Sequence, residues 1–138
     1  MKHLYHHECH SCPSKMAEIR AKLRESAADC GFDEQTTHHL VLAVDEACTN
    51  IIRHAYEGKT DGRIELDLFS DHDFWEVRLR DYGKKCPPEK LRGRPLSEVR
   101  PGGLGLHFIR FAFDEVIFDT NQTEGTCLRL RKKISKKK

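Results

Sequence analysis

A polar stripe follows one border of the helix predicted from Asp33 to about Tyr56. Glu46, Asn50 and His54 are spaced by four residues. Because each residue advances about 100° around an α-helix, they lie beside its apolar stripe rather than opposite it. A carboxylate and a carboxamide one turn apart can share the oxygen shell of a divalent cation or hold a water between them. Border polar residues that cap neighbouring loops are the simpler alternative for any one of the three.

A second candidate group lies at the end of a predicted strand. Asp81 shares its parity with the apolar residues Val77 and Leu79, so its carboxylate points into the core and needs a hydrogen-bond donor there. The exocyclic amine of a purine could supply that donor, and Gly83 would let the backbone approach a ligand closely. A turn-forming Asp-x-Gly without a ligand is the alternative.

Thr126 is expected to point in the same direction from the last predicted strand. It follows Gly125 and shares its parity with Leu128 and Leu130, which face the core. Its hydroxyl therefore faces inward as well. Asp81 and Thr126 can line one pocket from two different strands.

A glycine-rich segment, Gly102-Gly103-Leu104-Gly105-Leu106, joins a long loop to a predicted helix. Backbone N–H groups at such a junction can close around phosphate oxygens, because the helix dipole favours anions at its N-terminus. Loop hinges use glycine as readily, so this motif alone is weak. The specific signal is the ordered set of four features along the chain.

Hydrophobic periodicity predicts the elements that position these groups. Period-two alternation predicts strands at residues 3–11, 64–68, 75–80, 115–120 and 126–133. Helical spacing predicts helices from about Pro13 to Gly31, Asp33 to Tyr56 and Gly105 to Phe113. In the second helix the apolar stripe is Leu40, Ala43, Val44, Ala47, Ile51 and Ala55. The order of elements predicts a two-layer α+β sandwich, a mostly antiparallel sheet covered on one face by helices.

The composition predicts one folded domain over residues 1–138. Lys and Arg number 24 against 22 Asp and Glu, a formal net charge of +2. This balance is too even to argue for nucleic-acid binding, and we expect no direct contact with nucleic acid. The longest apolar run, Leu40–Val44, is far shorter than the roughly 20 residues that span a bilayer. No signal peptide opens the sequence. We therefore expect a cytoplasmic protein without membrane contact, ending in a solvated basic tail at residues 134–138.

Residues 1–12 form a polar N-terminal arm whose side chains include metal-ligating types. A Cys-x-x-Cys pair with nearby histidines could hold a metal, but no second pair follows at zinc-finger spacing, and a polar edge strand is the alternative. In a reducing cytosol we expect no structural disulfide among the six cysteines. The candidate ligands of the arm are His3, His6, His7, Cys9, His10 and Cys12.

Taken together, the four features resemble the GHKL (Bergerat-fold) ATPase family. Within it the chain is most similar to the small stand-alone serine kinases that act as anti-sigma factors, of the RsbW and SpoIIAB type. The resemblance is carried by Glu46–Tyr56, Asp81–Gly83, Pro101–Leu106 and Gly125–Thr126. It extends from about residue 14 to 134.

The resemblance implies a role for each candidate residue. Glu46 would be the general base, and Asn50 would ligate a Mg²⁺ ion that bridges the ATP phosphates. Asp81, helped by Thr126, would accept a hydrogen bond from the adenine amine. Gly83 would make room for the base. His54 is taken as a structural support of the pocket wall.

Residues 82–103, which hold four of the five prolines, would form a lid over the ATP. Arg100 is a candidate contact to the γ-phosphate or to a partner. The nucleotide contacts implied for the lid end are Gly102, Gly103, Leu104, Gly105 and Leu106.

The resemblance also implies an activity and partners. The chain would be an ATP-dependent serine/threonine-protein kinase that phosphorylates a serine on a STAS-domain antagonist, releases ADP, and binds a sigma factor or another effector. A homodimer formed through the first strand and helix is expected. A non-catalytic module whose ATP or ADP sets its affinity for a partner is the alternative, and an autonomous ATP hydrolase is a third. Glu46 favours the kinase, because a binding module needs no base.

Overall fold

The fold is described from a computed structural model over residues 1–11, 16–84, 103–121 and 123–134. Within these ranges five strands form one antiparallel sheet in the order β1-β2-β3-β5-β4. The strands are β1 (Lys2–His10), β2 (Arg63–Ser70), β3 (Phe74–Asp81), β4 (Glu115–Asp119) and β5 (Cys127–Lys133), and the helical segments are α1 (Ala17–Asp29), α2 (Glu34–Asn50), η2 (Ile51–Ala55) and α3 (Gly103–Ala112).

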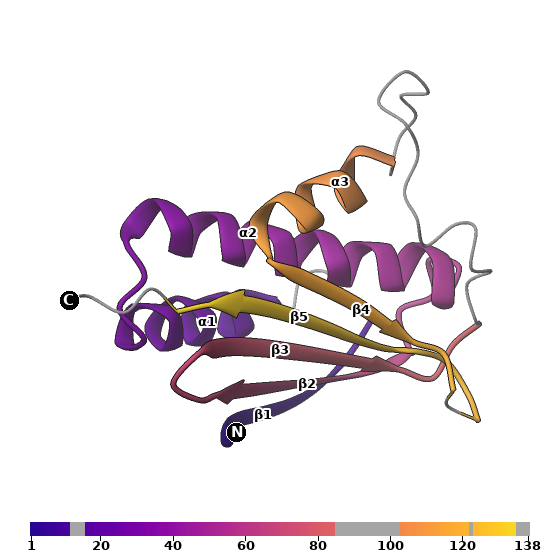
Figure 1. The fold of residues 1–138 in the computed structure, drawn as a ribbon. Helices are drawn as coiled ribbons and strands as arrows, with labels where there is room; N and C mark the ends of the chain where they lie inside the picture. Colours follow the sequence, from indigo (N-terminus) through magenta and orange to yellow (C-terminus); the bar gives the residue numbers. More distant parts are fainter. Residues whose placement is uncertain (12–15, 85–102, 122, 135–138) are drawn as a thin grey trace.

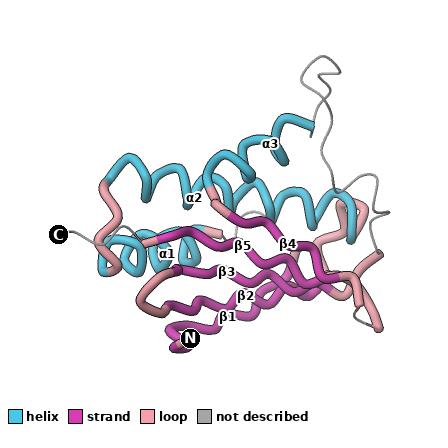
Figure 2. Tube along the Cα trace, in the orientation of Figure 1, coloured by secondary structure: helices cyan, strands magenta, loops and turns pink. Residues whose placement is uncertain are grey.

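The helices form a second layer on one face of this sheet (Figures 1 and 2). This architecture confirms the predicted two-layer α+β sandwich. The order of elements and most of their bounds agree with the hydrophobic periodicity. The first helix differs, because α1 begins at Ala17, whereas its predicted start at Pro13 lies outside the described residues.

The long second helix follows from local signals at its start and from burial along one side. Asp33 caps α2, since its side chain accepts a hydrogen bond of 2.7 Å from the Thr36 N–H. The side of α2 that faces the sheet is buried, and the residues that line it are Leu40, Val41, Ala43, Val44, Ala47 and Cys48. That burial fixes the rotation of the helix about its axis. The placement of Glu46 and Asn50 follows from it.

Trp75 joins the two layers at the centre of the core. The side chain of this β3 residue is fully buried, and its indole N–H donates a 3.0 Å hydrogen bond to Ser26 Oγ on α1. Its ring stacks on Phe113 with centroids 6.4 Å apart and meets Phe32 edge-on at 6.0 Å. Aromatic contacts of this kind add to the area that the ring buries. They tie α1 and the segments flanking α2 and α3 to the sheet.

The opposite face of the sheet carries a charged network rather than helices. Glu76 on β3 is fully buried there, because three arginines surround its carboxylate. Arg131 Nε lies 2.8 Å and Arg129 Nη2 3.5 Å from Glu76 Oε1, and Arg78 contacts Oε2. The arginines also cover aromatic rings, as Arg131 does 4.1 Å from the Phe74 centroid. Charge and aromatic surface together shield this carboxylate from water.

The N-terminal arm is an edge strand. His3 Nε2 and His6 Nδ1 lie 2.9 and 2.7 Å from the same oxygen, Asp67 Oδ1 on β2. The described residues contain no cluster of three or more His, Cys, Asp or Glu side chains fit to hold a metal ion, and Cys12 lies outside them. The four cysteines in the described ranges are free thiols. No helix in the same ranges is long and apolar enough to cross a membrane.

Candidate functional site

Asp81 ends β3 with its side chain turned into the core and only 4% of its surface exposed. Its Oδ1 accepts a 3.1 Å hydrogen bond from the Gly83 N–H. Burial raises the pKa of this carboxyl, and the backbone N–H groups of Gly83 and Thr126 offset part of that rise. Within the described residues no ion pair reaches the carboxylate. Asp81 is therefore a buried acceptor with capacity for a further donor.

Thr126 lies next to Asp81, as strand parity predicts. The Asp81 N–H donates a 3.0 Å hydrogen bond to the Thr126 carbonyl, and the Thr126 side chain is buried. Gly125 makes this approach possible, because a Cβ at that position would lie 2.6 Å from Asp81 Oδ1. Its φ of +68° also suits glycine. The structure thus brings the two strand ends together at one place.

Gly83 joins this strand end to the helical layer. A Cβ at Gly83 would lie 2.3 Å from the Ala55 carbonyl oxygen, and the Lys84 N–H donates a 2.8 Å hydrogen bond to that same oxygen. The need for glycine here therefore arises within the fold, at its contact with η2. The sequence analysis assigned Gly83 to the space around a base and gave Ala55 no part in the site.

Glu46 and Asn50 lie one turn apart at the C-terminal end of α2, and both are half-buried. Asn50 Oδ1 is buried without a hydrogen-bond partner in the described part of the chain. The Glu46 carboxylate is half-exposed one turn before it. Unpaired buried acceptors are rare in folded proteins and indicate a ligand or an ordered water. Two oxygen-bearing side chains are thus left available side by side.

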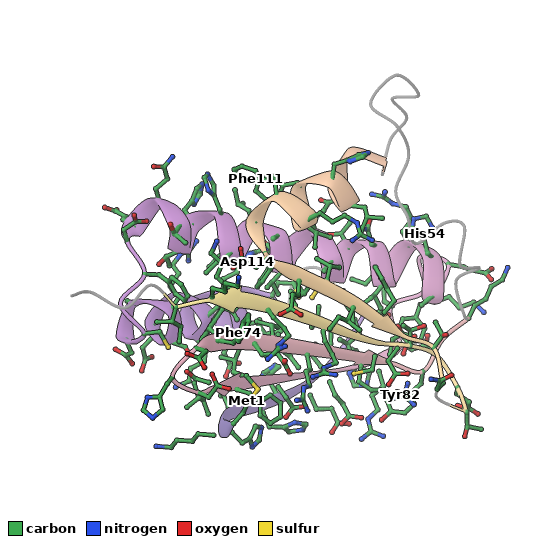
Figure 3. All side chains as sticks on the ribbon, in the orientation of Figure 1. Met1, His54, Phe74, Tyr82, Phe111 and Asp114 are labelled. Carbon is green, nitrogen blue, oxygen red and sulfur yellow. The ribbon has the colours of Figure 1, made fainter. Side chains whose placement is uncertain are left out.

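The helix changes its form directly after Asn50. η2 is a π-helical turn, in which the Tyr56 N–H donates to the Ile51 carbonyl at 3.2 Å, five residues back. A spacing of four no longer completes one turn in such a segment, so His54 leaves the polar stripe. Its side chain is exposed (Figure 3), and its role as a support of the pocket wall stays a prediction. Single π-turns of this kind are frequent at functional sites.

The glycine-rich segment begins α3. Its described residues, Gly103, Leu104, Gly105 and Leu106, form the first turn, and the Leu106 side chain is buried. α3 packs along α2, with its N-terminal end toward the C-terminal half of α2 (Figure 1). Gly102 and Arg100 lie outside the described residues, as does nearly all of the predicted lid.

Tyr56 joins the ends of β2 and β3 beside Asp81, although the sequence analysis gave it no role. Its hydroxyl accepts a 2.7 Å hydrogen bond from the Tyr82 N–H and donates to the Arg63 carbonyl. No spacing rule would have selected an aromatic residue at the end of a helix for this position. Its only signal in the sequence is a ring with a polar tip beside a turn rich in glycine.

Comparison with known proteins gives this arrangement a family. The family described as the histidine kinase-like ATPase domain matches residues 9–132. A protein named serine-protein kinase RsbW from Listeria monocytogenes is 32% identical over 133 residues, covering 91% of this chain and 83% of the relative. Proteins of the same name from Oceanobacillus iheyensis (28% identical, covering 89% of this chain and 82% of the relative) and Bacillus pumilus (31% identical, covering 79% and 74%) are also similar. The chain belongs to the histidine kinase-like ATPase domain family, in its branch of RsbW-type serine-protein kinases.

Proposed function

We propose that this protein transfers phosphate from ATP to a serine or threonine side chain, with the nucleotide held between the end of α2 and the Asp81 end of β3. One observation carries the proposal. Asn50 Oδ1 is buried and unpaired among the described residues, and the half-exposed Glu46 carboxylate lies one turn before it on α2. A buried acceptor without a partner costs about 1–3 kcal/mol. A cation bound at this oxygen would remove that cost.

The opposite wall of the proposed site suits adenine. The Asp81 carboxylate can accept a hydrogen bond from the exocyclic amine of the base, and Thr126 lies beside it. At the other end, the first N–H groups of α3 have no acceptor within the helix. They can donate to phosphate oxygens, which the helix dipole also favours.

The Asn50 and Glu46 side chains fit a magnesium ion. Mg²⁺ takes oxygen ligands and is commonly held by one or two protein side chains together with substrate phosphates. Asn50 would hold the ion through Oδ1. When bound, Mg²⁺ neutralises charge on the phosphates of ATP.

Glu46 is the proposed general base. Its carboxylate takes the proton of the substrate hydroxyl while the hydroxyl oxygen forms its bond to the γ-phosphorus of ATP. The bond from the γ-phosphorus to the bridging oxygen breaks, and ADP leaves with that electron pair. The products are a phosphorylated side chain, ADP and a protonated Glu46.

The names of the relatives support a protein serine as acceptor. We take the substrate to be a STAS-domain antagonist, and the chain to bind a sigma factor or another effector when the antagonist is not available. A homodimer formed through β1 and α1 is part of the same proposal. Such a partner switch needs the kinase as a separate chain from both partners.

Glu46→Gln tests the base directly. Removing a general base lowers transfer by about 10²–10⁴-fold, while ATP binding should persist because the amide keeps an oxygen at the same place. Transfer of labelled γ-phosphate and calorimetric titration with ATP measure the two effects. Asp45→Asn is the matched control, since Asp45 lies on the same turn but pairs with Arg20 at 2.7 Å. Unchanged transfer by Glu46→Gln would exclude Glu46 as the base.

The same two measurements, made on the wild-type chain, separate the kinase from the alternative function. A wild-type chain that binds ATP and changes its affinity for a partner, yet transfers no phosphate, would be a nucleotide-gated binding module. Hydrolysis of ATP at the same rate with and without a protein substrate would favour the autonomous hydrolase instead.

A further inference from the structure

The Tyr56 hydroxyl lies between two strands at the point where their pairing stops. β2 and β3 pair in register down to Ile64 opposite Asp81, so the next pair in line is Arg63 with Tyr82. At that pair the Tyr82 N–H donates to Tyr56 Oη at 2.7 Å, and the Tyr56 hydroxyl donates to the Arg63 carbonyl. A side chain from the helical layer therefore relays a hydrogen bond from one strand to the other.

The Tyr56 ring is fixed in this place by close packing. A Cβ at Gly62 would lie 2.4 Å from the ring carbons of Tyr56, so the Gly62 backbone rests directly on the ring. Burial raises the pKa of the Tyr56 hydroxyl. The group therefore keeps its proton at neutral pH and remains a donor to the Arg63 carbonyl.

Below the relay, successive backbone N–H groups are held by different parts of the fold. The Asp81 N–H donates to the Thr126 carbonyl beside β5. The Tyr82 N–H donates to the Tyr56 hydroxyl, and the Gly83 N–H donates to Asp81 Oδ1. The Lys84 N–H then reaches the Ala55 carbonyl. The Tyr82 ring lies at the end of the sheet (Figure 3), where its hydroxyl donates to Glu65 Oε1. The chain thus turns from the sheet to η2 within four residues.

The orientation of the Asp81 carboxylate depends on this turn. Gly83 donates to Oδ1, so the position of the Gly83 N–H sets how the carboxylate is rotated. Gly83 in turn follows Tyr82, whose N–H is held by Tyr56. Without the hydroxyl, the Tyr82 N–H loses its acceptor, and the strand end is free to close onto β2 or to move away from it.

We propose that Tyr56 is a positioning residue that sets the Asp81 carboxylate for adenine and against guanine. The inference rests on the proposed nucleotide site. A carboxylate accepts from the amine at C6 of adenine, whereas it meets the carbonyl oxygen at C6 of guanine, and hydrogen-bonding sites discriminate strongly only when their groups are well placed. Tyr56 acts on this choice through Asp81 and touches no phosphate.

Tyr56→Phe removes only the hydroxyl. We expect the variant to bind ADP about tenfold more weakly, with GDP affinity unchanged, so that the preference for ADP over GDP falls about tenfold. The KM for ATP should rise by a similar factor, with kcat within about twofold of wild type because Glu46 and Asn50 are untouched. Calorimetric titration and steady-state kinetics measure these values. Tyr82→Phe is the control, since it removes a hydroxyl that donates to Glu65 Oε1 and leaves the Tyr82 N–H in place.

A merely structural role for Tyr56 would lower the melting temperature and leave the ratio of ADP to GDP affinity unchanged, and that result would overturn the inference alone. A wild-type chain that binds no ADP would overturn the proposed function as well. Amide hydrogen exchange of the wild-type protein gives a test that needs no variant. The Tyr82 amide should exchange as slowly as those within β3, and fast exchange would contradict the relay.

Discussion

Two carboxylates are buried in this sheet, and the fold treats them in opposite ways. Glu76, on the face opposite the described helices, is fully buried with Arg78, Arg129 and Arg131 around it. Asp81 on the core face is 4% exposed, yet its described partners are backbone N–H groups alone. The first carboxylate is compensated by charge. Within the described residues the second is compensated mainly by backbone dipoles, with a smaller contribution from the charge of Arg80.

The difference separates structure from function. A buried charge whose partners are all supplied by the fold stabilises the folded state only as part of its network, because removing one member leaves the others uncompensated. A buried carboxylate without a cation has its pKa raised and destabilises the fold when ionised. Such a group is retained where a ligand completes its surroundings. The contrast supports the proposal that Glu76 serves the fold and that Asp81 serves the nucleotide site.

The largest effect is expected at Glu76. Glu76→Gln keeps the shape of the side chain but leaves the three arginines without their shared anion, and Arg78 lies directly opposite Arg129 on the neighbouring strand. We expect the free energy of unfolding to fall by about 3 kcal/mol, with ADP affinity of the folded protein unchanged. Urea denaturation measures the loss. Glu115→Gln, which breaks a more exposed pair with Arg131, should cost about 0.5 kcal/mol or less.

Asp81→Asn should give the reverse pattern. Asparagine has one acceptor oxygen where aspartate has two. When that oxygen keeps the hydrogen bond from the Gly83 N–H, the NH₂ group meets the adenine amine, donor against donor. We therefore expect ADP to bind about 10- to 100-fold more weakly, because an unpaired buried group costs about 1–3 kcal/mol. Near pH 4, stability without nucleotide should change little. Calorimetric titration measures the affinity, and Asp67→Asn on the other face of the sheet is the control. Equal affinity in wild type and Asp81→Asn would return Asp81 to the role of a turn residue.

The smallest effect is a dependence on pH. The pKa of Asp81 is raised from its usual 3.8 by burial, so the folded state holds this proton longer than the unfolded state does. The folded protein without nucleotide therefore loses stability as the pH rises from about 3.8 through the raised pKa. Asp81→Asn lacks this loss, so the variant should gain stability relative to wild type between pH 4 and pH 7. Urea denaturation at pH 4 and pH 7 gives the free energy of unfolding of both proteins. If the difference between variant and wild type is the same at the two pH values, Asp81 is not an unpaired buried carboxylate.

The sequence predicted the elements because their signals are local. The Asp33 cap and the alternation of Val77, Leu79 and Asp81 each fix an orientation within a few residues. The same alternation placed Asp81 and Thr126 on the core side of the sheet. The spacing of four failed at His54, because the π-turn after Asn50 changes the helical repeat. A local rule does not foresee such a change of repeat, and the last residue of η2, Ala55, lies against the strand end at Gly83 and Lys84.

The sequence by itself determined the two layers, the order of the elements and the polar residues offered to the site, since periodicity decides which face of each element is apolar. Only the tertiary structure decided how those residues are partnered. Glu76 and Asp81 are both acidic residues of one strand, and strand parity puts them on opposite faces without telling which carboxylate is surrounded by three arginines. The distinction arises from side chains and backbone groups distant in sequence, at Arg129, Thr126 and Tyr56. Hydrogen bonds and ion pairs depend on distances between elements, and these exist only once the chain has folded.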